Sequence, residues 1–316
     1  MTVNPASPAQ APERATADPG TPAGPGTPTP EANSAVPAPA RRRMPPRAWV
    51  ALGFLALVVL GAAVGPLLLP YSATETDLPN RLLPPGARLS DGGVALLGTD
   101  QLGRDLLAQI LAGSRVSVIV GLATVLIGGF AGLVLGLLAG YFGGWIDTLI
   151  SRLGDAQLAF PSVLLAILIA GVLGPSLTNI IIALAVTRWV IFARVVRASA
   201  LTVQGLEYVE SARVVGAGHV RILVRYILPS CWAPLLVAGT AQIGLAMVAE
   251  ASLSFLGLGV PVTQASWGAT ISDGRDYLSS AWWISTLPGV ALALVVVVVG
   301  LVSDAYRDHT DPRAAL

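Results

Sequence analysis

The sequence predicts an all-α integral membrane protein with six transmembrane helices, and three observations lead to this prediction. Of the 316 residues, 54% are apolar and only 12% are charged, and the mean hydropathy is +0.71. Soluble domains carry about 25% charged residues, so this composition is hard to reconcile with a surface that faces only water. The apolar residues are also gathered into six runs, most of them near the length that crosses a hydrocarbon layer of about 30 Å.

The composition also excludes several kinds of chemistry. All 19 basic residues are arginines, so the chain lacks the lysine with which a P-loop grips phosphate, and any ATP must be bound by another chain. The lone Cys231 cannot form an intramolecular disulfide. His219 and His309 stand in no H-E-x-x-H pattern, so we expect no metal site and no zinc hydrolase. A net charge of +1 without basic-aromatic interleaving sets nucleic-acid binding aside.

The N-terminal segment is rich in proline and alanine. Residues 1–46 contain 12 of the 24 prolines, and such a stretch cannot bury enough apolar surface to offset the entropy lost on ordering. We therefore expect a disordered cytoplasmic tail over residues 1–47, with a docking arm as the alternative.

The first apolar run follows this tail directly. An uncharged stretch begins at Trp49, just after a cluster of arginines, and predicts a first transmembrane helix over residues 48–70. A cleaved signal peptide is the alternative, but the long preceding tail and the length of the apolar run argue against it. Residues 71–112 are then expected as an extracytoplasmic loop, 113–304 as the core transmembrane domain and 305–316 as a cytoplasmic tail.

Five further apolar runs complete the six-helix prediction. Pro161 lies near the start of the run over 157–173, and the turn Gly174-Pro175-Ser176 joins that run to the next as a tight helical hairpin. The runs are centred on residues 116–139, 157–173, 177–192, 233–257 and 284–303.

The arginines predict the orientation of these helices. With the N-terminus inside, thirteen arginines fall in cytoplasmic segments and five in outer segments, and Arg188 falls near a membrane edge. Because short cytoplasmic loops are enriched in basic residues, both termini are expected in the cytoplasm. This orientation places a long loop over residues 258–283 outside and another over 194–230 inside.

The second apolar run carries a glycine at every fourth position. In lipid, such a ladder forms a flat groove into which a neighbouring helix can press its backbone. We expect a helix-packing face here, with a pore-lining or hinge role as the alternative. Its residues are Gly128, Gly132, Gly136 and Gly140.

The inner segment from Glu207 to Ser230 has helical character, a glycine break and then a basic amphipathic stretch. From composition alone, an ordinary solvated loop is the first interpretation. The segment is nevertheless similar to the Glu-Ala-Ala loop of ATP-binding-cassette (ABC) importer permeases. The matching residues are Glu210, Ala212, Gly216, Leu228 and Pro229, with departures at Ser211 and Tyr226.

Further motifs resemble one subfamily, the dipeptide and oligopeptide permeases of the C-subunit type. Residues 97–107 read LGTDQLGRDLL, and residues 250–260 read EASLSFLGLGV. Residues 266–278 and 304–313 carry the remaining matches. The resemblance covers residues 48–313 and leaves only the proline-rich tail outside it.

This resemblance implies the fold of a type I ABC importer permease and a set of partners. The partners are a second permease subunit in a heterodimer, two ATPase subunits that hold ATP and Mg²⁺, and an extracytoplasmic substrate-binding protein. The chain itself would have no cofactor and no catalytic residues, and would lie in the lipid bilayer of a bacterial or archaeal plasma membrane. The implied substrates are di- and oligopeptides, with nickel chelates, haem, glutathione or oligosaccharides as alternatives.

The same resemblance makes the inner segment a coupling helix that inserts into the ATPase. Gly216 would permit a turn that a side chain obstructs. The implied coupling residues are Glu210, Ser211, Ala212, Arg213, Gly216, His219, Arg221, Leu228 and Pro229.

The outer motifs allow two interpretations. Their charges would form a local ion-pair network that caps the following helix, with Thr99 or Asp100 as the N-cap. Alternatively, they would contact the docked binding protein or its substrate gate. The residues concerned are Thr99, Asp100, Gly103, Arg104, Asp105, Asp273, Arg275 and Asp276.

Glu250 is an ionisable residue within the fifth apolar run. Such residues are costly at membrane depth and indicate function by default, so we expect either a gate or a structural bond to a neighbouring helix. A secondary transporter would need more intramembrane ion ligands than this one residue. A membrane-embedded enzyme would need a nucleophile, metal or acid-base cluster, and neither histidine offers one.

Overall fold

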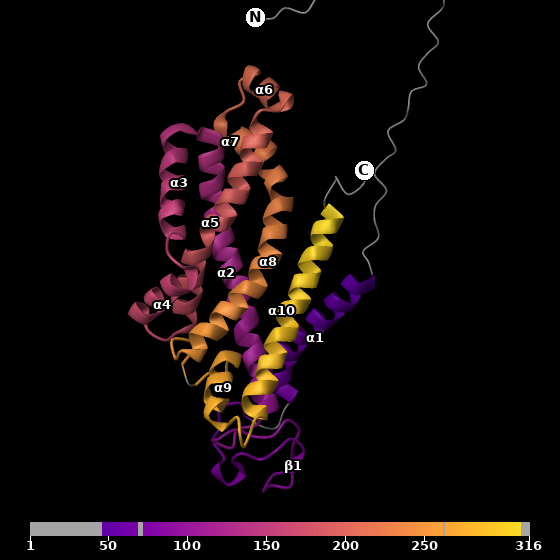
Figure 1. Ribbon diagram of the computed structural model, residues 1–316. Helices are drawn as coiled ribbons and strands as arrows, with labels where there is room; N and C mark the ends of the chain where they lie inside the picture. The colour runs from indigo at the N-terminus through magenta and orange to yellow at the C-terminus, as the bar shows by residue number, and fades with distance from the viewer. Residues whose placement is uncertain (1–45, 69–71, 262, 311–316) are drawn as a thin grey trace, which may run out of the picture. The chain divides into compact units, whose positions relative to one another are not determined.

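The computed structural model describes residues 46–68, 72–261 and 263–310, and all of them belong to one compact unit, Arg41–Leu316. The predicted tail lies outside the described residues up to residue 45, as does the end of the chain from residue 311. The all-α membrane class predicted from the sequence is confirmed, because long apolar helices dominate the described chain (Figure 1).

Seven helices make up the membrane part of the described chain. Consecutive long helices run in opposite directions in Figure 1, so the α6–α7 end and the α9 end lie at opposite faces of the bundle. The seven are α1 (Pro46–Leu68), α2 (Leu106–Phe142), α3 (Gly144–Leu158), α4 (Ser162–Leu173), α5 (Leu177–Gln204), α8 (Leu228–Phe255) and α10 (Trp283–Thr310).

Shorter elements occupy the two ends of the bundle. Antiparallel strands β1 (Ala87–Arg88) and β2 (Val94–Ala95) form a small hairpin before α2. A π-helical turn joins α7 to α8 just before Pro229, a residue that has no backbone N–H to donate. The other short elements are α6 (Glu207–Val214), α7 (His219–Ile222), α9 (Trp267–Gly274), and 3-10 turns at Leu78–Asn80 and Arg275–Tyr277.

The third crossing differs from the single helix expected over 157–173. Pro161 cannot continue the preceding helix, so α3 ends at Leu158 and α4 starts at Ser162, with 88° between their axes. The 12 residues of α4 cover only about 18 Å, too little to cross a membrane alone. The two helices together form one bent candidate crossing. The hydropathy pattern missed α3 because charged residues interrupt it.

Four other described helices are long and apolar enough to cross, namely α2, α5, the continuous helix His219–Phe255 and α10. The bent α3–α4 pair is a fifth candidate, and α1 adds a shorter apolar segment, Trp49–Gly65. With the bent pair counted once, the described chain has five candidate crossings, and the predicted first crossing corresponds to the shorter apolar segment of α1.

The expected inner loop over 194–230 is mostly helical instead. The α5 helix continues to Gln204, and the helix that begins at His219 runs without interruption into α8. Arg188 lies near the middle of α5, and its expected place near a membrane edge stays a prediction. The hydropathy run ended early because arginines in the C-terminal half of α5 lower the local average.

The glycine ladder of α2 lies against α5. A Cβ at Gly128 would come within 3.2 Å of the Ala185 carbonyl oxygen, and a Cβ at Gly140 within 2.7 Å of the Ala200 Cβ. All four glycines of the ladder are buried. The two helices pack backbone to backbone, which is the close contact that small residues permit in lipid.

Candidate functional site

The α9 end of the bundle, which the sequence predicts to be the outer end, is organised around the buried carboxylate of Asp100. Its Oδ1 accepts hydrogen bonds from the backbone N–H groups of Leu102 and Arg104, at 2.8 and 2.9 Å. Its Oδ2 accepts from Arg104 Nε at 2.6 Å and from Gln109 Nε2 at 2.8 Å. Four donors therefore converge on one buried carboxylate and satisfy both of its oxygens.

Arg104 and Gln109 extend this cluster from the outer loop to α9. Arg104 Nη2 donates to Asp273 Oδ2 at 3.1 Å, and Thr270 Oγ1 donates to Gln109 Oε1 at 3.1 Å. A small cavity of about 190 Å³ borders the same side chains. We call Asp100, Arg104, Gln109, Thr270 and Asp273 the outer cluster. The sequence analysis did not single out Gln109 or Thr270. The signal for Gln109 was its position as a lone amide one turn into an apolar helix.

The neighbouring motif residues shape the loop that carries Asp100. A Cβ at Gly103 would overlap the Asp77 carbonyl, and its φ of +79° is a conformation that favours glycine. Thr99 is buried, and its hydroxyl donates to the Asn80 carbonyl at 2.6 Å. Trp283 Nε1 donates to the Thr99 carbonyl at 3.1 Å and so ties the loop to α10.

The N-cap of α2 is Asp105, so the expectation of Thr99 or Asp100 is wrong. Asp105 Oδ1 accepts from the Ala108 N–H at 2.8 Å, whereas Thr99 and Asp100 are occupied within the loop. Burial raises the pKa of Asp105, and backbone hydrogen bonds from Ala108 and Leu107 oppose that rise.

Arg275 and Asp276 do not join the outer cluster. They form an exposed pair of neighbours, with Arg275 Nε 3.3 Å from Asp276 Oδ1. The Arg275 guanidinium also lies 6.0 Å from the centre of the Phe255 ring. The predicted outer site is therefore two separate groups, of which only the Asp100 group is buried.

Glu250 links α8 to α2 and has no exposed surface. Its Oε2 accepts from the Ser117 hydroxyl at 3.0 Å, and its Oε1 accepts from the Ser254 hydroxyl at 2.7 Å. No ion pair among the described residues involves it. The carboxyl group is thus held by two neutral donors between two helices.

The opposite end presents α6 as an exposed helix. Val214 and Val215 at its C-terminal end are 89% and 88% exposed, and Gly216 follows with a φ of +84°. The predicted coupling residues Glu210, Ser211, Arg213, His219, Arg221 and Pro229 are also exposed, while Ala212 and Leu228 are partly buried. This surface has charge and apolar area but few partners within the described chain.

Tyr141 joins this end to α2 and was missed by sequence analysis. Its hydroxyl lies 2.8 Å from His219 Nδ1 in a hydrogen bond. The Arg213 guanidinium lies 5.6 Å from the centre of the Tyr141 ring, within the range of a cation–π interaction. The α6–α7 segment is therefore fixed to the C-terminal end of α2 by two contacts on one side chain.

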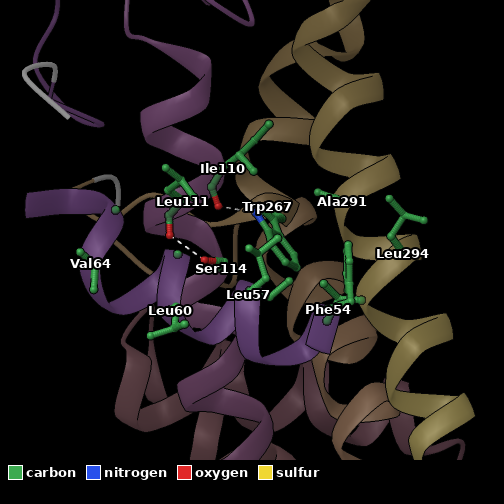
Figure 2. Close-up of a pocket in the computed structure, with 14 residues that line it drawn as sticks. Phe54, Leu57, Leu60, Val64, Ile110, Leu111, Ser114, Trp267, Ala291 and Leu294 are labelled. Atoms are coloured by element: carbon green, nitrogen blue, oxygen red, sulfur yellow. Dashed lines mark hydrogen bonds between the residues drawn. The ribbon is translucent and has the colours of Figure 1, made fainter. Parts of the chain in front are cut away.

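A third feature is a groove of about 690 Å³ between α1, α2 and α10, with Trp267 in its wall (Figure 2). Trp267 Nε1 donates to the Ile110 carbonyl at 2.8 Å, and the Ser114 hydroxyl donates to the Leu111 carbonyl at 2.7 Å. Because these polar groups are satisfied within the chain, the groove offers a polar ligand no anchor. Across the described residues, no three His, Cys, Asp or Glu side chains gather as a metal site would require.

Comparison with known protein families gives two matches, one over the C-terminal half of the chain and one near its N-terminus. Residues 132–316 match the family described as binding-protein-dependent transport system inner membrane component. Residues 43–85 match the N-terminal transmembrane domain of oligopeptide transport permease C.

Relatives match over most of the chain. The Di/tripeptide transport system permease protein DppC of Pseudomonas aeruginosa is 41% identical, over 82% of this chain and 86% of that protein. The Dipeptide transport system permease protein DppC of Alkalihalophilus pseudofirmus is 38% identical, over 84% and 86%. The Nickel transport system permease protein NikC of Escherichia coli is 41% identical, over 84% and 93%.

A solved structure shares the fold at low sequence identity. The MetNI methionine ABC transporter, in inward-facing conformations, matches with a TM-score of 0.51 and 17% identity, over 64% of this chain and 97% of that chain. The family match covers more than half of this chain, and the relatives cover more than four fifths of it. The chain therefore belongs to the binding-protein-dependent transport system inner membrane components, and it is a multi-pass membrane permease.

Proposed function

We propose that the chain is one permease subunit of an ATP-driven importer of di- and oligopeptides. It pairs with a second permease subunit to form the translocation path, and two ATPase subunits hold ATP and Mg²⁺ beneath them. An extracytoplasmic binding protein delivers the substrate, and both termini of the chain face the cytoplasm. The chain itself carries no cofactor and no catalytic residue.

The observation that carries this proposal is the exposed α6 segment at the end of a family-matched helical bundle. Two exposed valines lie beside the charged residues Glu210 and Arg213, which suits insertion into a groove of another protein. The Gly216 turn and the Tyr141 contacts hold the segment in place. A rigid segment of this kind can transmit the closure of two ATPase subunits to the membrane helices.

Movement of α6 has two routes into the membrane helices. One is the pair of contacts that Arg213 and His219 make with Tyr141 on α2. The other is the continuous helix His219–Phe255, which carries the inner end directly to Glu250. Rigid elements with two discrete packings switch between inward-open and outward-open states without melting.

The outer cluster lies at the opposite end of the helical bundle from α6. It ties the loop before α2 to α9 through Arg104 and Asp273, so this face is a pre-formed platform. We assign it the docking of the binding protein. A nickel chelate is the second candidate substrate, because the nickel permease relative is as similar to this chain as the di/tripeptide permease relative.

Reconstitution of the full complex in proteoliposomes tests the proposed function. We expect uptake of a labelled dipeptide that requires ATP, the ATPase subunits and the loaded binding protein, and no uptake of nickel chelate. Uptake without the ATPase subunits would overturn the proposal, and nickel uptake without peptide uptake would replace the substrate.

Val214→Asp and Val215→Asp together should lower peptide uptake about tenfold or more and release the ATPase subunits during purification. Both side chains are almost fully exposed, so the fold does not depend on them, while charges in an apolar contact are costly. Val94→Asp, on the exposed hairpin at the other end, is the matched control and should retain the ATPase subunits. Normal retention in the double variant would contradict the docking role of α6.

Glu250→Gln should impair uptake about tenfold and leave the complex assembled. The amide keeps the shape of the carboxyl group but has one acceptor oxygen instead of two. The Ser117 and Ser254 hydroxyls donate to different oxygens of Glu250, so the amide cannot accept both hydrogen bonds. Glu75→Gln, an exposed change outside α6 and the outer cluster, is the control. The measurement is uptake per assembled complex, and uptake at the unmodified rate would remove Glu250 from the mechanism.

A further inference from the structure

Arg188 is a charged residue in the middle of a membrane helix. It lies on α5, is half-buried, and reaches across to α8. Its Nη1 donates to Gln242 Oε1, and its Nη2 donates to the Leu245 carbonyl at 2.9 Å. Its Nε is buried and has no hydrogen-bond partner among the described residues.

The other two arginines on the inner half of α5 are neutralised, and Arg188 is not. Arg194 lies 2.7 Å from Asp155, and Arg197 makes a bidentate pair with Asp147. Arg188 takes part in none of the ion pairs among the described residues. Glu250 does not compensate it, because the Glu250 oxygens accept from Ser117 and Ser254.

An uncompensated guanidinium at membrane depth is costly and marks a functional position. Its acceptors here, an amide and a backbone carbonyl, are neutral, so they orient the group without cancelling its charge. The planar guanidinium presents paired donors that match a carboxylate. The missing partner is therefore an anion, and a carboxylate fits the geometry best.

The position of the guanidinium leaves room for such a partner. The guanidinium reaches the backbone carbonyl of Leu245, whose side chain is 52% exposed. Val248, on the next turn of α8, is also exposed. This face of α5 and α8 is not covered by the described chain. A group passing along it can meet the arginine without unfolding either helix.

We propose that Arg188 binds the carboxylate of the transported substrate during its passage through the membrane. The inference rests on the proposed import of peptides, each of which carries a C-terminal carboxylate. Gln242 and the Leu245 carbonyl act as positioning groups that hold the guanidinium toward the path. A carboxylate side chain of the second permease subunit is the other source of the same chemistry, and the experiment separates the two.

The test uses the reconstituted full complex with binding protein saturated by either of two labelled ligands, a dipeptide and its C-terminal amide. Initial uptake per loaded binding protein is measured for the unmodified chain and for Arg188→Gln. We expect Arg188→Gln to lower uptake of the free acid about tenfold or more and to leave uptake of the amide nearly unchanged. Because the binding protein is the same in all reactions, the change in the acid-to-amide ratio reports the permease alone.

Arg194→Gln is the matched control, since it removes the same charge from the same helix where Asp155 already neutralises it. It should leave the acid-to-amide ratio unchanged. An unchanged ratio in Arg188→Gln would overturn the inference while leaving peptide import intact. Equal loss of both ligands with loss of the second permease subunit on purification would assign the carboxylate to that subunit and also overturn it. Failure of the unmodified complex to import either peptide would overturn the proposed function, and this inference with it.

Discussion

Gly132→Ala is expected to cause the largest loss of folded protein of any single methyl group added to the glycine ladder. The added Cβ would overlap Phe192 Cβ and would lie 2.6 Å from the Trp189 carbonyl oxygen and 2.8 Å from the Ala193 nitrogen. Overpacking a well-filled core costs about 1–3 kcal/mol. Here the obstacles include backbone atoms, which cannot rotate away, so the upper end of that range applies.

The matched control for Gly132→Ala is Gly129→Ala on the same helix. A Cβ at Gly129 would meet Phe192 ring atoms at 4.0 Å, which is ordinary van der Waals contact. Yield after detergent extraction and the thermal midpoint of unfolding are the measurements. We expect a lower midpoint and yield for Gly132→Ala and little change for Gly129→Ala. Equal behaviour of the two variants would show that α2 and α5 are not locked at this position.

Asp100→Asn is expected to disrupt the outer end and uncouple it from the binding protein. The N–H groups of the asparagine amide would face groups that now donate hydrogen bonds to the carboxylate, among them Arg104 Nε and Gln109 Nε2. Breaking a buried charge pair by removing one partner costs about 3–5 kcal/mol. The outer loop should then lose its attachment to α9, because Arg104 also holds Asp273.

Binding-protein affinity and ATPase stimulation by the loaded binding protein are the measurements for Asp100→Asn. Both should fall about tenfold or more, with the ATPase subunits still bound at the other end. Asp276→Asn is the control, because that carboxylate is 74% exposed and has a single 3.3 Å contact with Arg275. Normal stimulation in Asp100→Asn would remove the outer cluster from docking and leave it a purely structural element.

Much of the membrane architecture could be predicted because hydropathy is a property of short stretches of sequence. The runs over 116–139, 177–192 and 284–303 each lie within a helix of the structure. The α3–α4 crossing could not be predicted in this way. Its first half is amphipathic and charged, and Asp147 is tolerated there because Arg197 of α5 pairs with it.

The candidate sites likewise divide into residues that the sequence could identify and residues that it could not. The motif around Asp100 could be identified because its residues are adjacent in sequence. Of the partners that complete the outer cluster, Gln109 has a weak local signal, whereas Thr270 could not be identified because it lies far along the chain. For the same reason Tyr141 was missed and Arg188 was named without a role, since a tyrosine or arginine in an apolar helix has no local pattern that predicts its partner.

The sequence by itself determined the class of the protein, the order of its helices and the location of its motifs, because these depend on composition and on residues close together in the chain. Only the tertiary structure decided that Pro161 divides one crossing in two, that Asp105 caps α2 and that Arg188 has no carboxylate partner among the described residues. These outcomes depend on what lies opposite each side chain, which is set by helix packing between segments that are distant in sequence.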